Sequence, residues 1–210
     1  MNSGLPTGTV TFLFTDIEGS TKLWQQHPDA MPNALTVHHA ILNNTIAAHR
    51  GYVFQIIGDA FCAAFSTATD GLEAALAAQR ALRAATWGET GAIRVRMALH
   101  TGTADVRVGE HTSGEYVSSL TLSRAARLLS AGHGGQILLS LPTAELVRDH
   151  LLPEVILRDL DAHRLKDLIR PEHIYQAVVP DLPHEFLPLK TLDTYPNNLP
   201  IQLTSFIGRE

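Results

Sequence analysis

Two acidic residues occupy positions from which a carboxylate could hold a metal ion. Asp16 directly follows the run 9–15, which is rich in β-branched and aromatic residues and predicts a buried strand. Asp59 follows Gly58 between two short strand-like runs, in a Gly-first connection typical of a type II′ hairpin turn. If this strand and hairpin share a sheet, both carboxylates can meet at one edge. Mg²⁺ and Mn²⁺ are typically held by one or two carboxylates and by substrate phosphates, so the pair suits such ions.

Each acid also has a simpler interpretation. Asp16 could merely cap the helix that follows it, and Asp59 could merely fill a turn. The residues that flank each acid distinguish between these alternatives.

The elements that would position these acids follow from the apolar periodicity. Strands are predicted over about 9–15, 52–57, 60–65, 93–101 and 136–140, and helices over about 34–50, 70–87 and 118–130. Gly51 is expected to end the first long helix as its C′ residue. The order predicts an α+β fold with a ferredoxin-like, palm-like β-α-β-β-α-β core, to which further strands and a helix are added.

The C-terminal part has a different composition. Five prolines fall between positions 180 and 200, which predicts an extended linker rather than packed structure. We therefore expect a main domain over 1–179 and a linker over 180–210.

Composition limits the classes of function. The chain of 210 residues is 45% hydrophobic with a net charge of −5, which argues against direct binding of nucleic acid through electrostatics. The single cysteine, Cys62, excludes an internal disulfide and suits a reducing compartment. No apolar run is long enough for a membrane span, and residues 1–8 do not resemble a signal peptide. We expect a cytoplasmic protein without a membrane interaction.

Four segments resemble the class III adenylate and guanylate cyclase catalytic domain, and the resemblance covers about 8–179. They are FTDIEGST at 14–21, IGDAF at 57–61, RVRMALHTG at 94–102 and SRAARL at 123–128. The context resembles cyclase domains at the N-terminus of large LuxR-type bacterial regulators, because residues 198–210 resemble the entry to an NTPase module. A longer protein with C-terminal NTPase and DNA-binding modules is therefore one expectation.

The resemblance implies conversion of ATP to 3′,5′-cyclic AMP and pyrophosphate, with two Mg²⁺ or Mn²⁺ ions in each active site. Asp16, Asp59 and the backbone of Ile17 would hold the metals. Arg127 would stabilise the transition state, and Ser123 would take the place of the family's ribose-orienting Asn. In this family the sites form in a head-to-tail homodimer, so Arg127 would come from the partner chain. The remaining substrate contacts implied near the first metal motif are Phe14, Gly19, Ser20 and Thr21.

Three positions depart from the family pattern. The adenine-reading Lys is replaced by Gln55, whose amide both donates and accepts and so does not choose between ATP and GTP. The second base-reading position falls on Tyr116, or on Glu115 if one residue is inserted. Ser123 is shorter than Asn, and loss of a transition-state donor can lower turnover on the order of 10²–10³-fold. The alternative is a weak or inactive cyclase-like module that senses nucleotide or dimerises within a transcriptional regulator.

Overall fold

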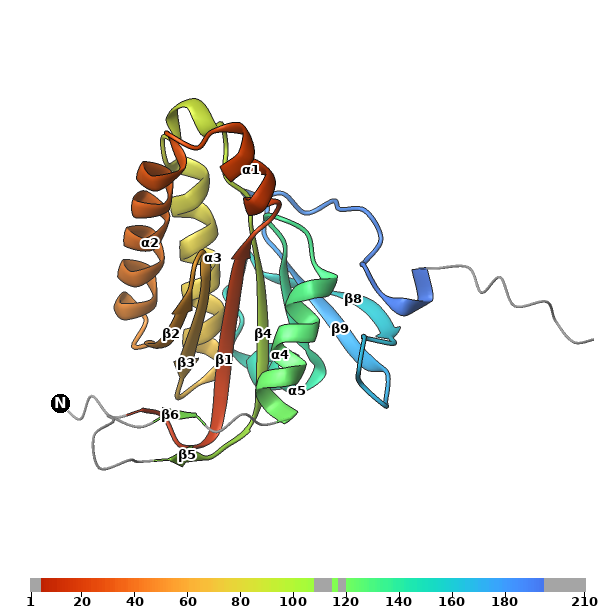
Figure 1. The fold of residues 1–210 in the computed structure, drawn as a ribbon. Helices are drawn as coiled ribbons and strands as arrows, with labels where there is room; N and C mark the ends of the chain where they lie inside the picture. The colour runs from red at the N-terminus through yellow and green to blue at the C-terminus, as the bar shows by residue number, and fades with distance from the viewer. Residues whose placement is uncertain (1–4, 108–114, 117–119, 195–210) are drawn as a thin grey trace, which may run out of the picture.

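The computed structural model describes residues 5–107, 115–116 and 120–194, which form a central sheet covered by helices on both faces (Figure 1). The strands of this sheet have the spatial order β2-β3-β1-β4-β7-β9-β8. Their bounds are Gly8–Ile17 (β1), Tyr52–Ile57 (β2), Ala60–Phe65 (β3), Val95–Ala104 (β4), Ile137–Ser140 (β7), Ile156–His163 (β8) and Glu172–Val178 (β9). A separate small pair joins Val106–Arg107 (β5) to Glu115–Tyr116 (β6). The helices are Ser20–Gln26 (α1), Met31–Ala48 (α2), Ala68–Ala84 (α3), Leu120–Ala131 (α4) and Leu141–Val147 (α5), with single 3-10 turns at Gly88–Thr90, Arg148–His150 and Leu192–Thr194.

The first four strands of this sheet confirm the ferredoxin-like core. β1 lies between β3 and β4, β2 lies outside β3, and all of these pairings are antiparallel. β7 then adds in parallel to β4, and the β8–β9 hairpin extends the sheet on that side. The predicted α+β class, with its additional strands and helix, is therefore correct.

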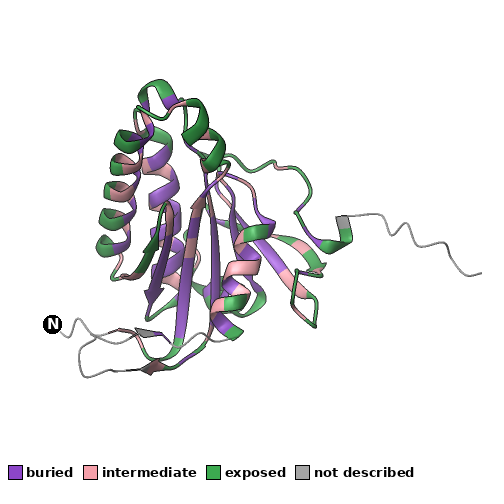
Figure 2. Cartoon of the chain, in the orientation of Figure 1, coloured by how far each residue is buried: buried purple, intermediate pink, exposed green. Residues whose placement is uncertain are grey.

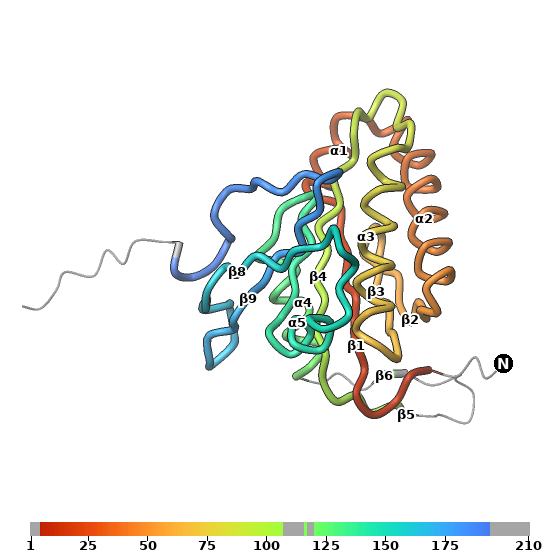
Figure 3. Tube along the Cα trace, turned by 180° about the vertical axis from the view of Figure 1, so that it is seen from behind, coloured from red at the N-terminus to blue at the C-terminus, as the bar shows by residue number. Residues whose placement is uncertain are grey.

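The central strand β1 is buried on both faces over most of its length, so apolar side chains from this strand point to both sides of the sheet (Figure 2). Leu13 and Ile17 belong to the core beneath α2 and α3, whereas Val10 and Phe12 belong to the core beneath α4. Figure 3 shows α2, α3 and α5 from the side opposite to Figure 1. No helix in the described ranges combines the length and apolar character needed to cross a bilayer.

Gly51 is required for close packing and not for ending α2. The residue with positive φ after α2 is Arg50, at 59°, which corrects the expectation that Gly51 would be the left-handed C′ residue. A Cβ atom on Gly51 would lie 2.4 Å from the ring of Phe65, so the backbone can approach that ring only without a side chain.

The Gly51→Ala variant should therefore lose stability. We expect a decrease of about 1–3 kcal/mol in the free energy of unfolding, measured by chemical denaturation, because the added methyl group overpacks the core. Adding Phe65→Leu to this variant should recover part of the loss. An unchanged denaturation midpoint in Gly51→Ala would contradict this packing argument.

The C-terminal segment packs against the domain as far as Asp193. Leu182 and Leu189 are buried, and the Lys190 amide donates to the carbonyl of Ala131 over 2.9 Å. The prediction of an unpacked linker beginning at Pro180 is therefore wrong for residues 180–193, since apolar residues between the prolines anchor an otherwise extended segment. The domain boundary at 179/180 stays a prediction, and residues 195–210 lie outside the described residues.

Candidate active site

The two predicted metal carboxylates lie at the same end of neighbouring strands. Asp16 is the penultimate residue of β1, and Asp59 is in the turn that joins β2 to β3, the strand paired with β1. The Ile17 amide donates a hydrogen bond of 3.0 Å to Oδ2 of Asp59. The Asp59 carboxylate thus lies beside the residue that directly follows Asp16.

The turn that carries Asp59 has the geometry the sequence indicates. Ile57 pairs with Ala60, which leaves a two-residue connection, and Gly58 has a φ of 61° that other residues rarely adopt. From α2, the His39 ring bonds through Nε2 to the carbonyl oxygen of Gly58 over 3.0 Å. A hydrogen bond on each side therefore holds the Asp59 turn in place.

Arg96 neutralises Asp16, an interaction that the sequence did not reveal. The two residues are opposite each other in the β1–β4 register, and Arg96 Nε donates to Asp16 Oδ2 over 3.0 Å. Arg96 Nη2 donates to the same oxygen. Within the described residues these bonds leave Oδ1 of Asp16 open, just as the bond from Ile17 leaves Oδ1 of Asp59 open. Each carboxylate can therefore bind a cation through its second oxygen.

The segment after Asp16 turns sharply into α1. Gly19 is the N-cap with a φ of 73°, and its carbonyl accepts from the Lys22 amide over 3.0 Å. Ser20 and Thr21 are the first two residues of the helix. This places the predicted phosphate-contacting residues directly beyond the carboxylates.

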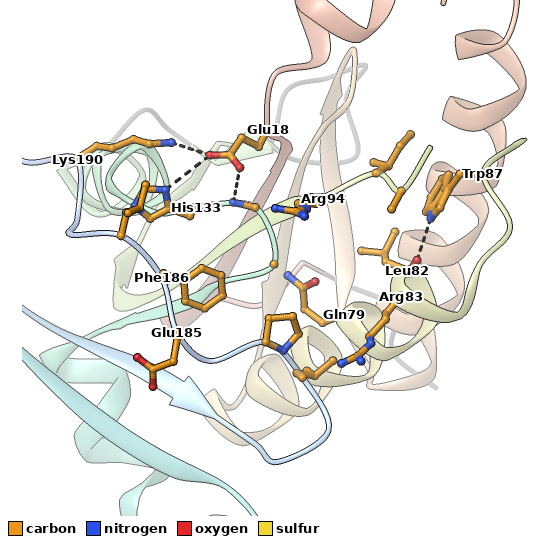
Figure 4. Close-up of a pocket in the computed structure, with 17 residues that line it drawn as sticks. Glu18, Gln79, Leu82, Arg83, Trp87, Arg94, His133, Glu185, Phe186 and Lys190 are labelled. Atoms are coloured by element: carbon orange, nitrogen blue, oxygen red, sulfur yellow. Dashed lines mark hydrogen bonds and ion pairs between the residues drawn. The ribbon is translucent and has the colours of Figure 1, made fainter. Parts of the chain in front are cut away.

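Glu18, in the same segment, is bonded to distant parts of the chain. Its carboxylate accepts from Lys190 Nζ over 2.7 Å and from the Gly134 amide over 3.1 Å (Figure 4). Although partial burial opposes ionisation, these bonds keep the pKa of Glu18 below its usual value. The segment after Asp16 is thus tied to the C-terminal segment, which sequence periodicity could not reveal.

The predicted base-reading residues differ in their placement. Gln55 is exposed on β2 and pairs with Cys62, which in turn pairs with Phe14 on β1, so the register places Gln55 and Phe14 on one face of the sheet. Tyr116 is buried, and its hydroxyl donates to the carbonyl of Pro6 over 2.7 Å. Burial raises the pKa of Tyr116 to about 12. The side chain of Glu115 lies outside the described part of the structure.

Tyr116 belongs to an aromatic cluster on the α4 face of the sheet. Its ring makes edge contacts at a centroid distance of 4.9 Å with both Phe12 and Phe54. Phe54 reaches this cluster because β2 has a register irregularity between Val53 and Gln55. The cluster supports the strands beside the carboxylates, and a base-reading role for Tyr116 stays a prediction.

Ser123 and Arg127 lie one turn apart on α4. Ser123 is exposed, and Arg127 forms an ion pair of 2.6 Å with Asp167, in the connection between β8 and β9. Among the described residues, no hydrogen bond or ion pair joins Arg127 to Asp16 or Asp59. The structure thus brings the two carboxylates together and leaves the guanidinium apart from them within one chain.

His38 packs beneath this site without a polar partner. It is fully buried in α2, its ring makes an edge contact with Phe61, and neither ring nitrogen has a hydrogen-bond partner in the described structure. Burial, together with the neighbouring His39, lowers the pKa of His38 to about 4. The folded state therefore holds this imidazole neutral.

This burial predicts a pH-dependent stability. Because the pKa of His38 is about 4 when folded and 6.5 in its ordinary state, the unfolded chain binds more protons in that window. The free energy of unfolding should therefore fall, by roughly 3 kcal/mol for this residue, as pH decreases from about 6.5 to 4. The His38→Leu variant should lose this contribution, while buried His100, whose pKa is also about 4, keeps its own. Denaturation curves recorded at both ends of the window check this, and identical pH slopes in variant and wild type would refute it.

Comparisons with known proteins identify the family of the chain. A model of the adenylate and guanylate cyclase catalytic domain matches residues 4–163. The chain therefore belongs to this family. It is 40% identical over 207 residues to an uncharacterized protein of Mycobacterium tuberculosis, Rv0891c, covering 97% of this chain and 68% of that protein.

Proteins of the same family from trypanosomes are also similar. The receptor-type adenylate cyclase GRESAG 4.3 of Trypanosoma brucei brucei is 29% identical over 208 residues, covering 81% of this chain and 17% of that protein. A structure of a Trypanosoma brucei adenylate cyclase in its monomeric state superposes with a TM-score of 0.78 at 28% identity, covering 89% of this chain and 96% of that one. The fold is thus that of a nucleotidyl cyclase catalytic domain.

Proposed function

We propose that this domain converts ATP to 3′,5′-cyclic AMP and pyrophosphate at a site shared by two chains. The observation that supports the proposal is the 3.0 Å bond from the Ile17 amide to Asp59, because it brings the Asp59 carboxylate to the residue that directly follows Asp16. An arrangement in which either acid only capped a helix or filled a turn would not require that proximity.

The residues at this edge fit divalent metal ions. Asp16 and Asp59 are both partly exposed, and each retains an oxygen without a bond in the described structure. In the described residues no three His, Cys, Asp or Glu side chains form a metal-binding group, so phosphates and water would have to supply the remaining ligands. Bound Mg²⁺ or Mn²⁺ would supply Lewis-acid activation of the ribose 3′-hydroxyl and neutralise phosphate charge. Asp16, Asp59 and the backbone of Ile17 would hold them.

The chain's own residues then have distinct tasks. The turn at Gly19 and the start of α1 would direct backbone amides toward the triphosphate, with Phe14, Ser20 and Thr21 beside it. Gln55, exposed on the same face as Phe14, would contact the base edge. Arg127 of the partner chain would donate to the α-phosphate as charge develops, and Ser123 would orient the ribose.

A head-to-tail dimer is supported by what the single chain leaves exposed. Ile57, immediately before the Asp59 turn, is 61% exposed, and Leu120 at the start of α4 is 62% exposed. Arg127 also has no bond to the carboxylates of its own described chain. Pairing two chains would cover these apolar side chains and bring a guanidinium to each metal site.

The test is to incubate the purified protein with ATP or GTP and Mn²⁺ and to quantify cyclic nucleotide by chromatography. Cyclic AMP that depends on Mn²⁺ supports the proposal, and a preference for GTP would correct the substrate. Saturable nucleotide binding without product would instead favour the second candidate, a nucleotide-sensing or dimerisation module of a larger transcriptional regulator. The exposed Gln55 and Ser123, each replacing a family residue, favour that candidate.

A further inference from the structure

A cavity of about 700 Å³ lies between the C-terminal segment and the body of the domain. Its walls come from the end of α3, the segment before β4, the loop at Gly134 and residues 182–190 (Figure 4). Its volume falls in the range of small-molecule sites, roughly 300–1,000 Å³. Neither Asp16 nor Asp59 lines it, so it is distinct from the proposed catalytic site.

Most of the wall is apolar. Leu82, Trp87, Ile93, Leu182 and Phe186 contribute carbon surface. Trp87 is largely buried in the core, its indole nitrogen donates to the carbonyl of Leu82 over 3.1 Å, and the part of its ring that lines the cavity offers an apolar aromatic surface. These residues suit an apolar body and offer it an aromatic surface.

The basic side chains at the cavity differ in whether they have a hydrogen-bond or ion-pair partner. Lys190 is paired with Glu18, and Arg83 donates to the main-chain carbonyl of Asp181 over 2.6 Å. Arg94 is exposed and lines the cavity, and among the described residues its guanidinium has neither an ion pair nor a hydrogen bond. In Figure 4 its side chain lies between Glu18 and Gln79. A planar guanidinium without a carboxylate partner is well suited to bind an acid group on a ligand.

We propose that this cavity is a second ligand site, which binds a small amphipathic anion. The apolar body of the ligand packs against Trp87 and Phe186, and its acid group pairs with Arg94. Because the cavity shares Glu18 with the segment that follows Asp16, a bound ligand lies in contact with the loop beside the catalytic carboxylates. The inference does not depend on cyclase activity, since it concerns binding alone.

The experiment compares two fluorescent probes that differ in charge. Anilinonaphthalene sulfonate supplies an aromatic body and an anion, and phenylnaphthylamine supplies the same body without charge. We expect saturable binding of the sulfonate probe to the folded 210-residue chain and its displacement by decanoate. The Arg94→Gln variant should weaken binding of the sulfonate about tenfold or more, and leave the neutral probe nearly unchanged.

Two further variants make the result specific to this cavity. Arg170→Gln removes the same charge from an exposed position in the β8–β9 connection that does not line the cavity, and it should leave both probes unaffected. Ala92→Trp introduces a large side chain at the cavity wall and should weaken both probes. The proposal is overturned if the sulfonate does not bind saturably, if Arg94→Gln and Arg170→Gln have equal effects, or if Ala92→Trp leaves both affinities unchanged.

Discussion

The Asp59→Asn variant is expected to lose cyclase turnover on the order of 10³-fold while remaining folded. The amide oxygen of Asn can still accept the hydrogen bond from Ile17, so the turn keeps its anchor, but the negative charge that would hold a divalent cation is gone. The measurement is the initial rate of cyclic AMP formation across a Mn²⁺ titration, with a thermal denaturation curve for each protein.

Asp149→Asn is the matched control, because Asp149 is exposed in the 3-10 turn after α5, far from the carboxylates in sequence and absent from their contacts. It should retain wild-type turnover. If Asp59→Asn kept its activity with an unchanged Mn²⁺ dependence, Asp59 would not be a metal ligand and the proposed function would fail with it.

The second large effect concerns Arg127. We expect Arg127→Ala to lower turnover about 10²–10³-fold, because it removes a donor that would act only on charge developing in the transition state. Its ion pair with Asp167 joins two partly exposed side chains, so the loss of stability should stay below about 1 kcal/mol. Arg170→Ala serves as the matched control and should be active.

Mixing the two inactive variants tests whether the site is shared. An equal mixture of Asp59→Asn and Arg127→Ala chains should recover about a quarter of wild-type activity, since random pairing places half of the chains in mixed dimers with one intact site each. If each site were built from a single chain, the mixture would stay as inactive as its components. That result would contradict the head-to-tail arrangement and leave the metal site itself intact.

The sequence predicted the elements around the carboxylates well because their signals are local. An apolar run ending at Asp16 and a Gly-first turn at Asp59 each describe a strand end or a turn by themselves, and the order of elements then indicated the sheet. The contacts of Arg96 could not be predicted in the same way. Alternation placed Arg96 on the polar side of a strand, but only the β1–β4 register brings it opposite Asp16.

The contacts of the C-terminal segment were missed for a related reason. Its prolines argue against regular secondary structure, and the segment contains no α-helix or strand among its described residues. Whether an extended segment packs depends on widely spaced anchors such as Leu182 and Leu189, which have no periodicity in the sequence. The bonds from Glu18 to Gly134 and Lys190 join residues more than 100 positions apart and follow from the tertiary fold alone.

The ion pair between Lys190 and Glu18 also bears on which residues should be included when the protein is expressed. A polypeptide shortened at Val179, the predicted boundary, would lack Leu189 and uncover the apolar side chains that it meets, including Leu138 and Ile174. It would also leave Glu18 without its lysine partner, two positions beyond Asp16, the proposed metal ligand. Assays on such a truncated protein would measure a domain in which the segment after Asp16 has lost its contacts with the C-terminal segment. The expressed chain should therefore extend at least to Asp193.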